Sequence, residues 1–255
     1  MKFIILRKSI LVLVVALVIT AGLLTLSYGG NNYASVYFGG APRKTPVYCV
    51  DTEEKKVALT FDSAWGADKT LSIIETLKEY NVKATFFLVG FWAEEHPDMV
   101  KAIADAGLEI GTHSNTHADF ANLSEDQMKL ELETSIDLIK KASPDTEVSL
   151  FRAPYGSYNN SVLTVAESMK LQTIQWDVDT LDWKGTSAIE IANRVMNKVK
   201  NGSIILCHNN SDHILDALPI MLDRLKMAGY TVTTVSDILL KDNFTIDHTG
   251  MQKSK

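Results

Sequence analysis

Ionisable side chains suited to acid–base or metal chemistry stand after short apolar runs at five places in this sequence. Such runs, bounded by polar residues, predict buried strands. In a sheet of parallel strands the carboxyl ends share one rim, so the side chains that follow them should converge on a single cleft. Carboxylates, imidazoles and a guanidinium gathered there predict acid–base or metal-assisted hydrolysis. These side chains belong to Asp62, His113, His117, Arg152, Asp179, Asp182 and His208.

Each residue taken singly also has an ordinary structural explanation. His113 and His117 would make an acceptable pair of surface histidines, and Arg152 a structural ion-pair partner. Asp177 lies near a strand end and could point away from the rim, and His208 could be a hydrogen-bonded core histidine. The functional interpretation rests on the set, because five such coincidences at five strand ends are hard to attribute to chance.

Strand-like and helix-like segments alternate along the body of the chain. This alternation predicts an α/β fold with a mostly parallel sheet, and about seven strands favour a (β/α) barrel. An open doubly wound sheet is the alternative, but it would carry a glycine-rich phosphate loop after the first strand, where this sequence has none. The expected strands are 57–61, 84–88, 109–112, 148–151, 173–178, 203–207 and 230–233. The expected helices are 69–80, 97–106, 124–141, 161–169, 187–199, 215–227 and 236–240. Ser124 and Gln127 predict a capping box at the start of the third helix.

Residues 1–28 differ in composition from the rest. Lys2, Arg7 and Lys8 precede an uncharged apolar run over 10–26, which as a helix would span about 26 Å, just enough to cross the hydrocarbon core of a bilayer. Cations before the run predict that the N-terminus stays in the cytoplasm and that the body is exported. We therefore expect a membrane anchor; a cleaved signal sequence is the alternative, although no clear small-residue cleavage site follows the run.

The other boundaries and the partner class follow from composition. Residues 29–54 begin with a glycine- and asparagine-rich stretch that predicts a linker, 55–241 form the expected globular domain, and 242–255 read as a polar tail. The chain has 255 residues, with 25 Lys and Arg against 31 Asp and Glu and a net charge of −6. It lacks the basic surplus that a nucleic-acid partner would require. Cys49 and Cys207 are too few for a disulfide scaffold and lack metal-binding spacing.

Five short motifs resemble, in order and spacing, those of the NodB-homology polysaccharide deacetylases. The resemblance extends over 56–240, nearly all of the expected globular domain. The form Ser63-Ala64-Trp65-Gly66, together with the apolar N-terminal segment, is similar to the sporulation-associated branch of that family. The five motifs are Thr60-Phe61-Asp62-Ser63, His113-Ser114-Asn115-Thr116-His117, Arg152-Ala153-Pro154-Tyr155, Asp179-Thr180-Leu181-Asp182-Trp183 and Leu206-Cys207-His208.

The resemblance implies a distorted (β/α) barrel of the glycoside hydrolase/deacetylase type and a hydrolase that uses a divalent metal, commonly zinc. Such enzymes remove N-acetyl, and sometimes O-acetyl, groups from chitin, xylan or peptidoglycan. On the matching positions, His113 and His117 would bind the metal and Asp62 would be the general base. Arg152 would pair with Asp62 and keep it ionised.

The same resemblance assigns the other half of the site. His208 would protonate the departing amine, with Asp182 orienting it and raising its pKa. The metal and the backbone N–H of Tyr155 would stabilise the oxyanion, and Leu206 and Trp183 would wall the pocket for the acetyl methyl group.

One position departs from the family pattern, in which a second aspartate follows the first and supplies a third metal ligand. Here that position is Ser63, whose neutral hydroxyl is a weak ligand. Asp68 could replace it, although a cap of the next helix is a simpler role. The alternative function is therefore a catalytically impaired, membrane-tethered protein that binds cell-wall glycan. A glycoside hydrolase using Asp62 and Asp182 would leave the histidine pair unexplained.

The expected partner is a bacterial cell-wall glycan outside the membrane, with N-acetylglucosamine or N-acetylmuramic acid of peptidoglycan as the acetylated sugar. If the sporulation-associated branch is the right one, the expected role is spore cortex formation or maintenance. The domain would then face the intermembrane space of the forespore.

Overall fold

The computed structural model describes Leu17 and residues 42–255. The rest of the expected membrane anchor and the first half of the expected linker, 29–41, lie outside the described residues. Contacts divide the chain into two units, Met1–Arg43 and Lys44–Lys255, and only the second is described in full. Among the described residues, no helix has the length and apolar character needed to span a membrane.

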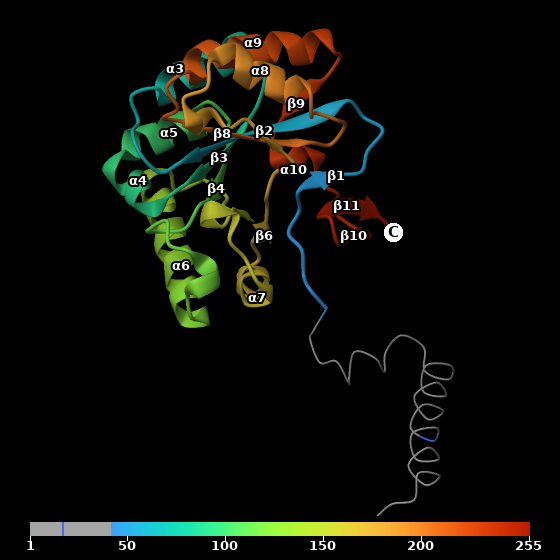
Figure 1. Ribbon diagram of the computed structural model, residues 1–255. Coiled ribbons are helices and arrows are strands. Elements are labelled where there is room, and N and C mark those ends of the chain that lie inside the picture. The colour runs from blue at the N-terminus through green and yellow to red at the C-terminus, as the bar shows by residue number, and fades with distance from the viewer. Residues whose placement is uncertain (1–16, 18–41) are drawn as a thin grey trace, which may run out of the picture. The chain divides into compact units, whose positions relative to one another are not determined.

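The centre of the unit Lys44–Lys255 is a curved sheet of parallel strands (Figure 1). Its hydrogen-bonded order is β6-β5-β4-β3-β2-β8-β7, and β9 pairs with the start of β2. Although β6 and β7 lie at opposite ends of this order, only residues 174–177 separate them in the chain, so the sheet curls round towards itself. The seven strands of this path form a half-barrel, in agreement with the expected (β/α) fold, and β9 is an eighth strand attached to β2. The strands are β2 (Lys56–Ser63), β3 (Thr85–Leu88), β4 (Glu109–Thr112), β5 (Leu150–Phe151), β6 (Gln172–Thr173), β7 (Val178–Asp179), β8 (Ile204–His208) and β9 (Thr231–Thr233).

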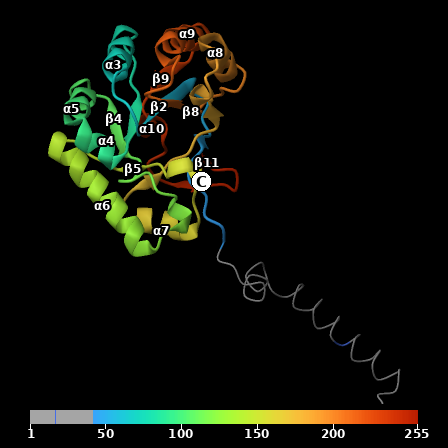
Figure 2. The same ribbon diagram turned by 60° about the vertical axis from the view of Figure 1, so that its left-hand side comes forward.

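Helices surround the sheet, as Figure 2 shows from the side of α6 and α7. Their apolar faces pack on the strands, where the largest buried cluster includes Phe61, Phe86 and Leu218. The capping box expected at Ser124 and Gln127 is present at the start of α6. The helices are α3 (Thr70–Glu79), α4 (Gly90–Glu95), α5 (Pro97–Asp105), α6 (Glu125–Ala142), α7 (Asn160–Ser168), α8 (Ala188–Met196), α9 (Ile214–Met227) and α10 (Val235–Ile238).

Two elements differ from the expectation. The single strand expected over 173–178 is two short strands, because Ile174 leaves the main sheet to form a bridge with Val47, and the N–H of Gln175 donates to the carbonyl of Val47. The helix α4 was not expected, since it has only six residues and follows β3 after a single residue.

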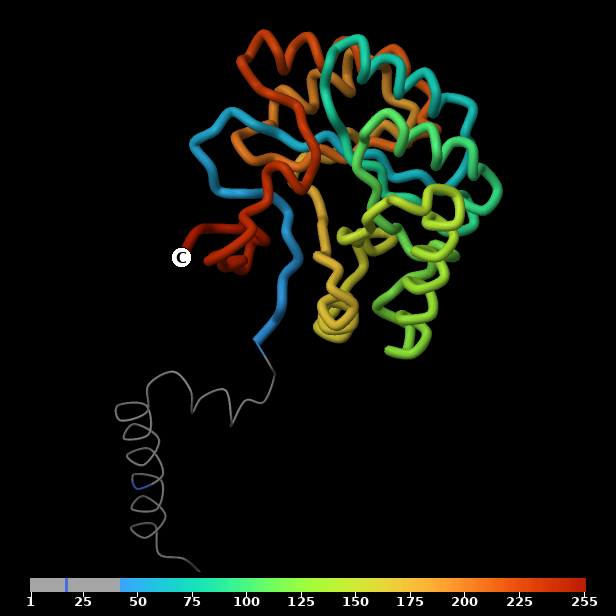
Figure 3. The backbone as a smooth tube through the Cα atoms, turned by 180° about the vertical axis from the view of Figure 1, so that it is seen from behind, coloured from blue at the N-terminus to red at the C-terminus, as the bar shows by residue number. Residues whose placement is uncertain are grey.

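A second, three-stranded sheet corrects the two outer boundaries of the domain. β1 (Cys49–Val50) pairs in parallel with β11 (Met251–Ser254), which pairs in turn with β10 (Phe244–Ile246) in antiparallel register. Seen from behind, the C-terminal strands lie beside the segment that enters the domain (Figure 3). The expected polar tail at 242–255 and the end of the expected linker, 44–54, are therefore parts of the folded unit. The tail is polar because its strands are mostly half-buried, and its one buried strand residue, Gln252, is satisfied by hydrogen bonds to Leu240.

Candidate active site

The five predicted positions share the carboxyl rim of the sheet. Asp62 ends β2, the histidine pair follows β4, Arg152 follows β5, Asp182 follows β7 and His208 ends β8. One cleft of about 580 Å³, a size typical of ligand pockets, is lined by these side chains, with two exceptions. Arg152 and Asp182 are not in the lining; they contact Asp62 and His208, which are. The predicted convergence is confirmed. The lining residues are Asp62, Ala64, Trp65, His113, His117, Tyr155, Trp176, Asp179, Trp183, Leu206, His208 and Asn210.

Asp62 and Arg152 form a buried ion pair. Arg152 Nη1 donates to Asp62 Oδ1 at 2.7 Å and to Thr60 Oγ1 at 2.9 Å. Its Nη2 donates to the carbonyl of Gln175, and the guanidinium lies 4.1 Å from the ring centroid of Phe87. Burial opposes ionisation of Asp62, but the charge of Arg152 outweighs it, and the pKa of Asp62 lies below its usual value. Asp62 is therefore a fixed carboxylate.

His113 and His117 stand at the same end of the cleft. His113 Nδ1 lies 2.7 Å from the carbonyl oxygen of Arg152. Because a carbonyl only accepts, Nδ1 carries the proton, and the unprotonated Nε2 faces Asp62 Oδ2 at 3.5 Å. The two imidazole rings are 5.0 Å apart, edge to face. Burial, followed by the proximity of His113, lowers the pKa of His117 to about 4, so both imidazoles are neutral at pH 7.

Neutral imidazoles are good zinc ligands, but a catalytic zinc site uses three protein ligands. Within the described ranges, no three His, Cys, Asp or Glu side chains are grouped so as to hold a metal. Ser63 stands where the resemblance implies a third ligand. Its Oγ is buried and has no hydrogen-bond partner among the described residues, and the same holds for His117 Nδ1. Asp68 is exposed, lies outside the cleft lining and makes no capping bond. The residues fit a zinc ion as a two-histidine site that lacks its third ligand.

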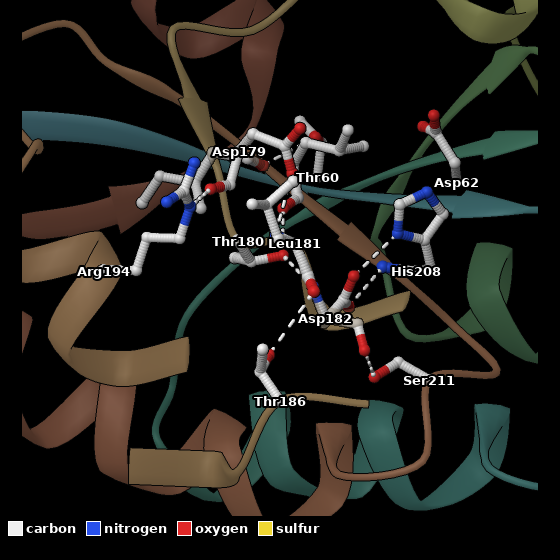
Figure 4. A network of polar contacts seen from close by, with 12 residues as sticks. Thr60, Asp62, Asp179, Thr180, Leu181, Asp182, Thr186, Arg194, His208 and Ser211 are labelled. Atoms are coloured by element: carbon white, nitrogen blue, oxygen red, sulfur yellow. Dashed lines mark hydrogen bonds and ion pairs between the residues drawn. The ribbon is translucent and has the colours of Figure 1, made fainter. Parts of the chain in front are cut away.

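His208 is held by Asp182 on the other side of the cleft (Figure 4). His208 Nδ1 lies 2.7 Å from Asp182 Oδ1, and the backbone N–H of His208 donates to Asp182 Oδ2. Asp182 is fully buried, and its carbonyl accepts from Ser211 Oγ. Burial lowers the pKa of His208, but the hydrogen bond and charge of Asp182 outweigh it, and the net pKa is raised. His208 is therefore suited to carry a proton at neutral pH.

The remaining predicted residues lie at the cleft edge. Tyr155 and Trp183 are 71% and 60% exposed, and Leu206 lies in β8 below them. Tyr155 has φ of +60°, a left-handed conformation that is strained for a tyrosine and common at functional sites. The hydrogen bonds of this turn are donated by Gly156 and Ser157. The N–H of Tyr155 consequently has no backbone acceptor among the described residues, and it is available to an oxyanion.

Several supporting residues were not foreseen. Trp65, Trp176 and Asn210 line the cleft without having been assigned to it. Glu131 of α6 accepts hydrogen bonds from the backbone N–H groups of Asn115 and Thr116 and so fixes the loop between the two histidines. Trp65 could have been identified from the sequence, because it stands beside Gly66 in the first motif rather than in an apolar segment of the core. Glu131 has no such signal in the sequence.

Asp177, for which a position away from the rim had been considered, does lie away from the cleft. Its carboxylate accepts from the N–H of Ile204 and from Ser203 Oγ, at the amino end of β8. Burial raises its pKa. Asp177 therefore helps to fix the edge of the sheet rather than the site.

Comparisons with known proteins agree with this geometry. Residues 50–174 match the family model described as polysaccharide deacetylase. A Bacillus cereus protein named peptidoglycan-N-acetylglucosamine deacetylase is 32% identical over 74% of this chain and 91% of its own length. Another of the same name and organism is 36% identical over 71% and 66%, and the uncharacterized protein YlxY of Bacillus subtilis is 30% identical over 76% and 60%. The chain thus spans about three fifths to two thirds of the latter two relatives.

Two solved structures share this architecture, one described as a pseudoenzyme and the other as a deacetylase. BA3943 of Bacillus anthracis, described as a CE4 family pseudoenzyme, superposes with a TM-score of 0.74 and 37% identity, covering 77% of this chain and 69% of that one. The peptidoglycan N-acetylglucosamine deacetylase Bc1960 superposes with a TM-score of 0.73 and 33% identity, covering 76% and 92%. Three findings agree: the sequence shared over most of a relative's length, the parallel sheet and the five rim positions. The chain therefore belongs to the polysaccharide deacetylase family.

Proposed function

We propose that this protein is a hydrolase that removes N-acetyl groups from a cell-wall polysaccharide, with peptidoglycan as the substrate. One observation carries the proposal: a carboxylate whose pKa is lowered by arginine and an imidazole whose pKa is raised by aspartate lie on adjacent strands. Asp62 and His208 are register partners in β2 and β8, and both line the cleft. A module that only binds glycan needs neither a fixed base nor a fixed acid.

Asp62 acts as the general base. Arg152 donates a hydrogen bond to Oδ1 of Asp62. This bond orients the carboxylate, and the charge of Arg152 keeps it ionised. Its Oδ2 lies towards His113 and the cleft, where it takes a proton from the water that attacks the acetamide carbonyl. The N–H of Tyr155 stabilises the negative charge that develops on the carbonyl oxygen.

His208 acts as the general acid. An amine leaves poorly unless it is protonated, so a proton donor is required on the nitrogen side of the acetamide. Asp182 binds Nδ1 of His208, which leaves Nε2 free to donate into the cleft. Leu206 and Trp183 line the space beside it, where the acetyl methyl group is excluded from water.

The proposal includes a divalent metal, with zinc favoured by the preference of that ion for imidazole nitrogen. His113 and His117 would hold it, and it would supply Lewis-acid polarisation of the acetamide carbonyl. The lack of a third protein ligand at Ser63 implies weak binding. Added metal should therefore be needed for full activity.

Acetate release from peptidoglycan and from N-acetylglucosamine oligomers tests the function. We expect release by the full chain with added zinc, and a loss of at least 1,000-fold in Asp62→Asn, which keeps the shape but removes the base. Met227→Ala, which removes an exposed side chain of α9 outside the cleft, is the control for purification. Release that persists in Asp62→Asn would exclude this role for Asp62.

A second candidate function is glycan binding without catalysis. Two features favour it: Ser63 stands where the family resemblance implies a second aspartate, and similar solved structures include a protein described as a pseudoenzyme. The same assay separates the two. Glycan binding without acetate release at any zinc concentration would identify a binding protein that retains the cleft.

We further propose that an N-terminal segment anchors the domain outside the cytoplasm and that the protein acts on spore cortex peptidoglycan. The apolar run after three cations supports the first proposal, and the form of the first motif supports the second. Fractionation of cells tests the anchor: recovery in the soluble fraction would exclude it. Unchanged cortex composition in spores of a deletion strain would exclude the sporulation role.

A further inference from the structure

Trp65 is an exposed aromatic residue of the cleft to which the proposed reaction gives no role. It lies in the loop between β2 and α3, directly after the motif that carries Asp62. Its side chain is 55% exposed, yet it lines the cleft. Removing an indole from water normally stabilises a fold, so a tryptophan kept exposed beside a site calls for a ligand that covers it.

The loop holds Trp65 in this position by fixed contacts. The carbonyl oxygen of Gly66 accepts hydrogen bonds from Trp92 Nε1 at 2.7 Å and from Asn209 Nδ2 at 2.8 Å. Gly66 has φ of +64°, which a residue with a side chain would adopt only with strain. The indole is thus presented by an ordered turn. Its exposure belongs to the folded structure.

Trp65 belongs to an aromatic surface at the histidine end of the cleft. Its ring lies edge to face with that of His117, with centroids 5.0 Å apart. His117 in turn lies edge to face with Tyr155 at 4.6 Å, and Tyr155 is the most exposed aromatic residue of the cleft. Two exposed rings therefore flank one candidate metal ligand.

The charge of the cleft limits what can lie on this surface. Its described lining includes two carboxylates, Asp62 and Asp179, and neither lysine nor arginine. The lining side chains thus offer an anionic sugar neither a lysine nor an arginine, whereas the apolar C–H face of an uncharged pyranose is complementary to an aromatic face.

We propose that Trp65 stacks on an uncharged N-acetylhexosamine ring of the polysaccharide, next to the ring from which acetate is removed. This inference rests on the proposed function and adds to it a binding position for a second sugar. It makes Trp65 a residue that selects oligomers over single sugars and N-acetylglucosamine over N-acetylmuramic acid at that position.

Binding by the full chain tests the inference independently of turnover. Calorimetric titrations with N-acetylglucosamine tetramer compare the wild type with Trp65→Ala, Trp65→Phe and Met227→Ala. The last removes an exposed side chain of α9 outside the cleft. We expect about tenfold weaker binding for Trp65→Ala and less than threefold for Trp65→Phe, which keeps an aromatic face. Met227→Ala should bind like the wild type.

Two further readouts separate stacking from a structural effect. In the wild type, the tetramer should shift the tryptophan fluorescence. Trp65→Phe should reduce that shift, and the remainder should come from Trp176 and Trp183, which line the same cleft. An alternating tetramer of N-acetylglucosamine and N-acetylmuramic acid should bind more weakly than the uncharged tetramer. Equal affinity of Trp65→Ala and the wild type would overturn the inference, as would tighter binding of the alternating tetramer.

Acetate release measured on the same samples distinguishes the two levels of proposal. Release by the wild type together with unchanged binding in Trp65→Ala would remove the role of Trp65 and leave the deacetylase intact. A wild type that neither binds the tetramer nor releases acetate would overturn both.

Discussion

At the scale of single residues, the proposed metal binding depends on Ser63. It follows Asp62, the proposed base, and is fully buried, and its Oγ has no hydrogen-bond partner among the described residues. A carboxylate at this position would add a charged ligand to two neutral imidazoles. Without metal the same carboxylate would lie buried beside Asp62, which is unfavourable for both.

These two effects predict the behaviour of Ser63→Asp. We expect zinc to bind at least tenfold more tightly in calorimetric titration, because an anionic ligand is added. We also expect the metal-free variant to unfold at a lower temperature than the wild type and to regain stability when zinc is added. Ser63→Asn, of similar size but uncharged, is the matched control. Equal zinc affinity in Ser63→Asp and Ser63→Asn would show that position 63 does not face the metal.

The pH dependence of activity belongs to the same scale. The pKa of Asp62 is lowered and that of His208 is raised, so the base is ionised and the acid protonated over a shared range. Activity should fall on the alkaline side as pH rises through the raised pKa of His208. Because Asp182 causes that rise, Asp182→Asn should move the alkaline limb of kcat/KM towards lower pH. An alkaline limb that stays in place would assign it to another group.

At the scale of elements, α6 determines where the histidine pair stands. Glu131 on this helix accepts hydrogen bonds from the N–H groups of Asn115 and Thr116 and from Thr116 Oγ1, at 2.7 to 2.9 Å. His117 at the end of this loop has φ of +59°, a strained conformation that needs support from its surroundings.

Removing that support should affect the site more than the fold. We expect Glu131→Ala to reduce acetate release and zinc affinity at least tenfold, with a cost in stability of about 1–3 kcal/mol for the unsatisfied loop donors. Glu133→Ala, on the exposed side of the same helix, should change neither. If both variants behave alike, the loop does not depend on α6.

The alternation of strands and helices made most elements predictable, because apolar periodicity reports which face of each element is buried. The rim residues could be assigned because they lie at the end of such a strand or within a few residues after it. The split between β6 and β7 could not be predicted. Ile174 is apolar like the residues of the neighbouring strands, and only its bridge to the distant Val47 takes it out of the main sheet. Tertiary contacts of this kind leave no local pattern.

At the scale of the whole molecule, the C-terminal strands contribute to the base of the barrel. Their polar sequence concealed this role, because the only fully buried side chain of β11 is an amide, Gln252. Gln252 Oε1 accepts from the N–H of Leu240 at 2.8 Å, and its Nε2 donates to the carbonyl of the same residue at 3.1 Å. These bonds join β11 to the segment after α10, and β11 pairs with β1 where the chain enters the domain.

Because both chain ends of the folded unit meet at this point, Gln252→Ala should destabilise the whole domain rather than fray its end. The substitution leaves two backbone groups of Leu240 without partners, and we expect unfolding free energy to fall by about 2 kcal/mol. Chemical denaturation followed by tryptophan fluorescence measures this, since all four tryptophans lie outside the C-terminal strands. Lys253→Ala, which removes only an exposed ion pair with Asp247, should change little. A Gln252→Ala domain that unfolds like the wild type would mean that the C-terminal strands attach to the barrel without stabilising it.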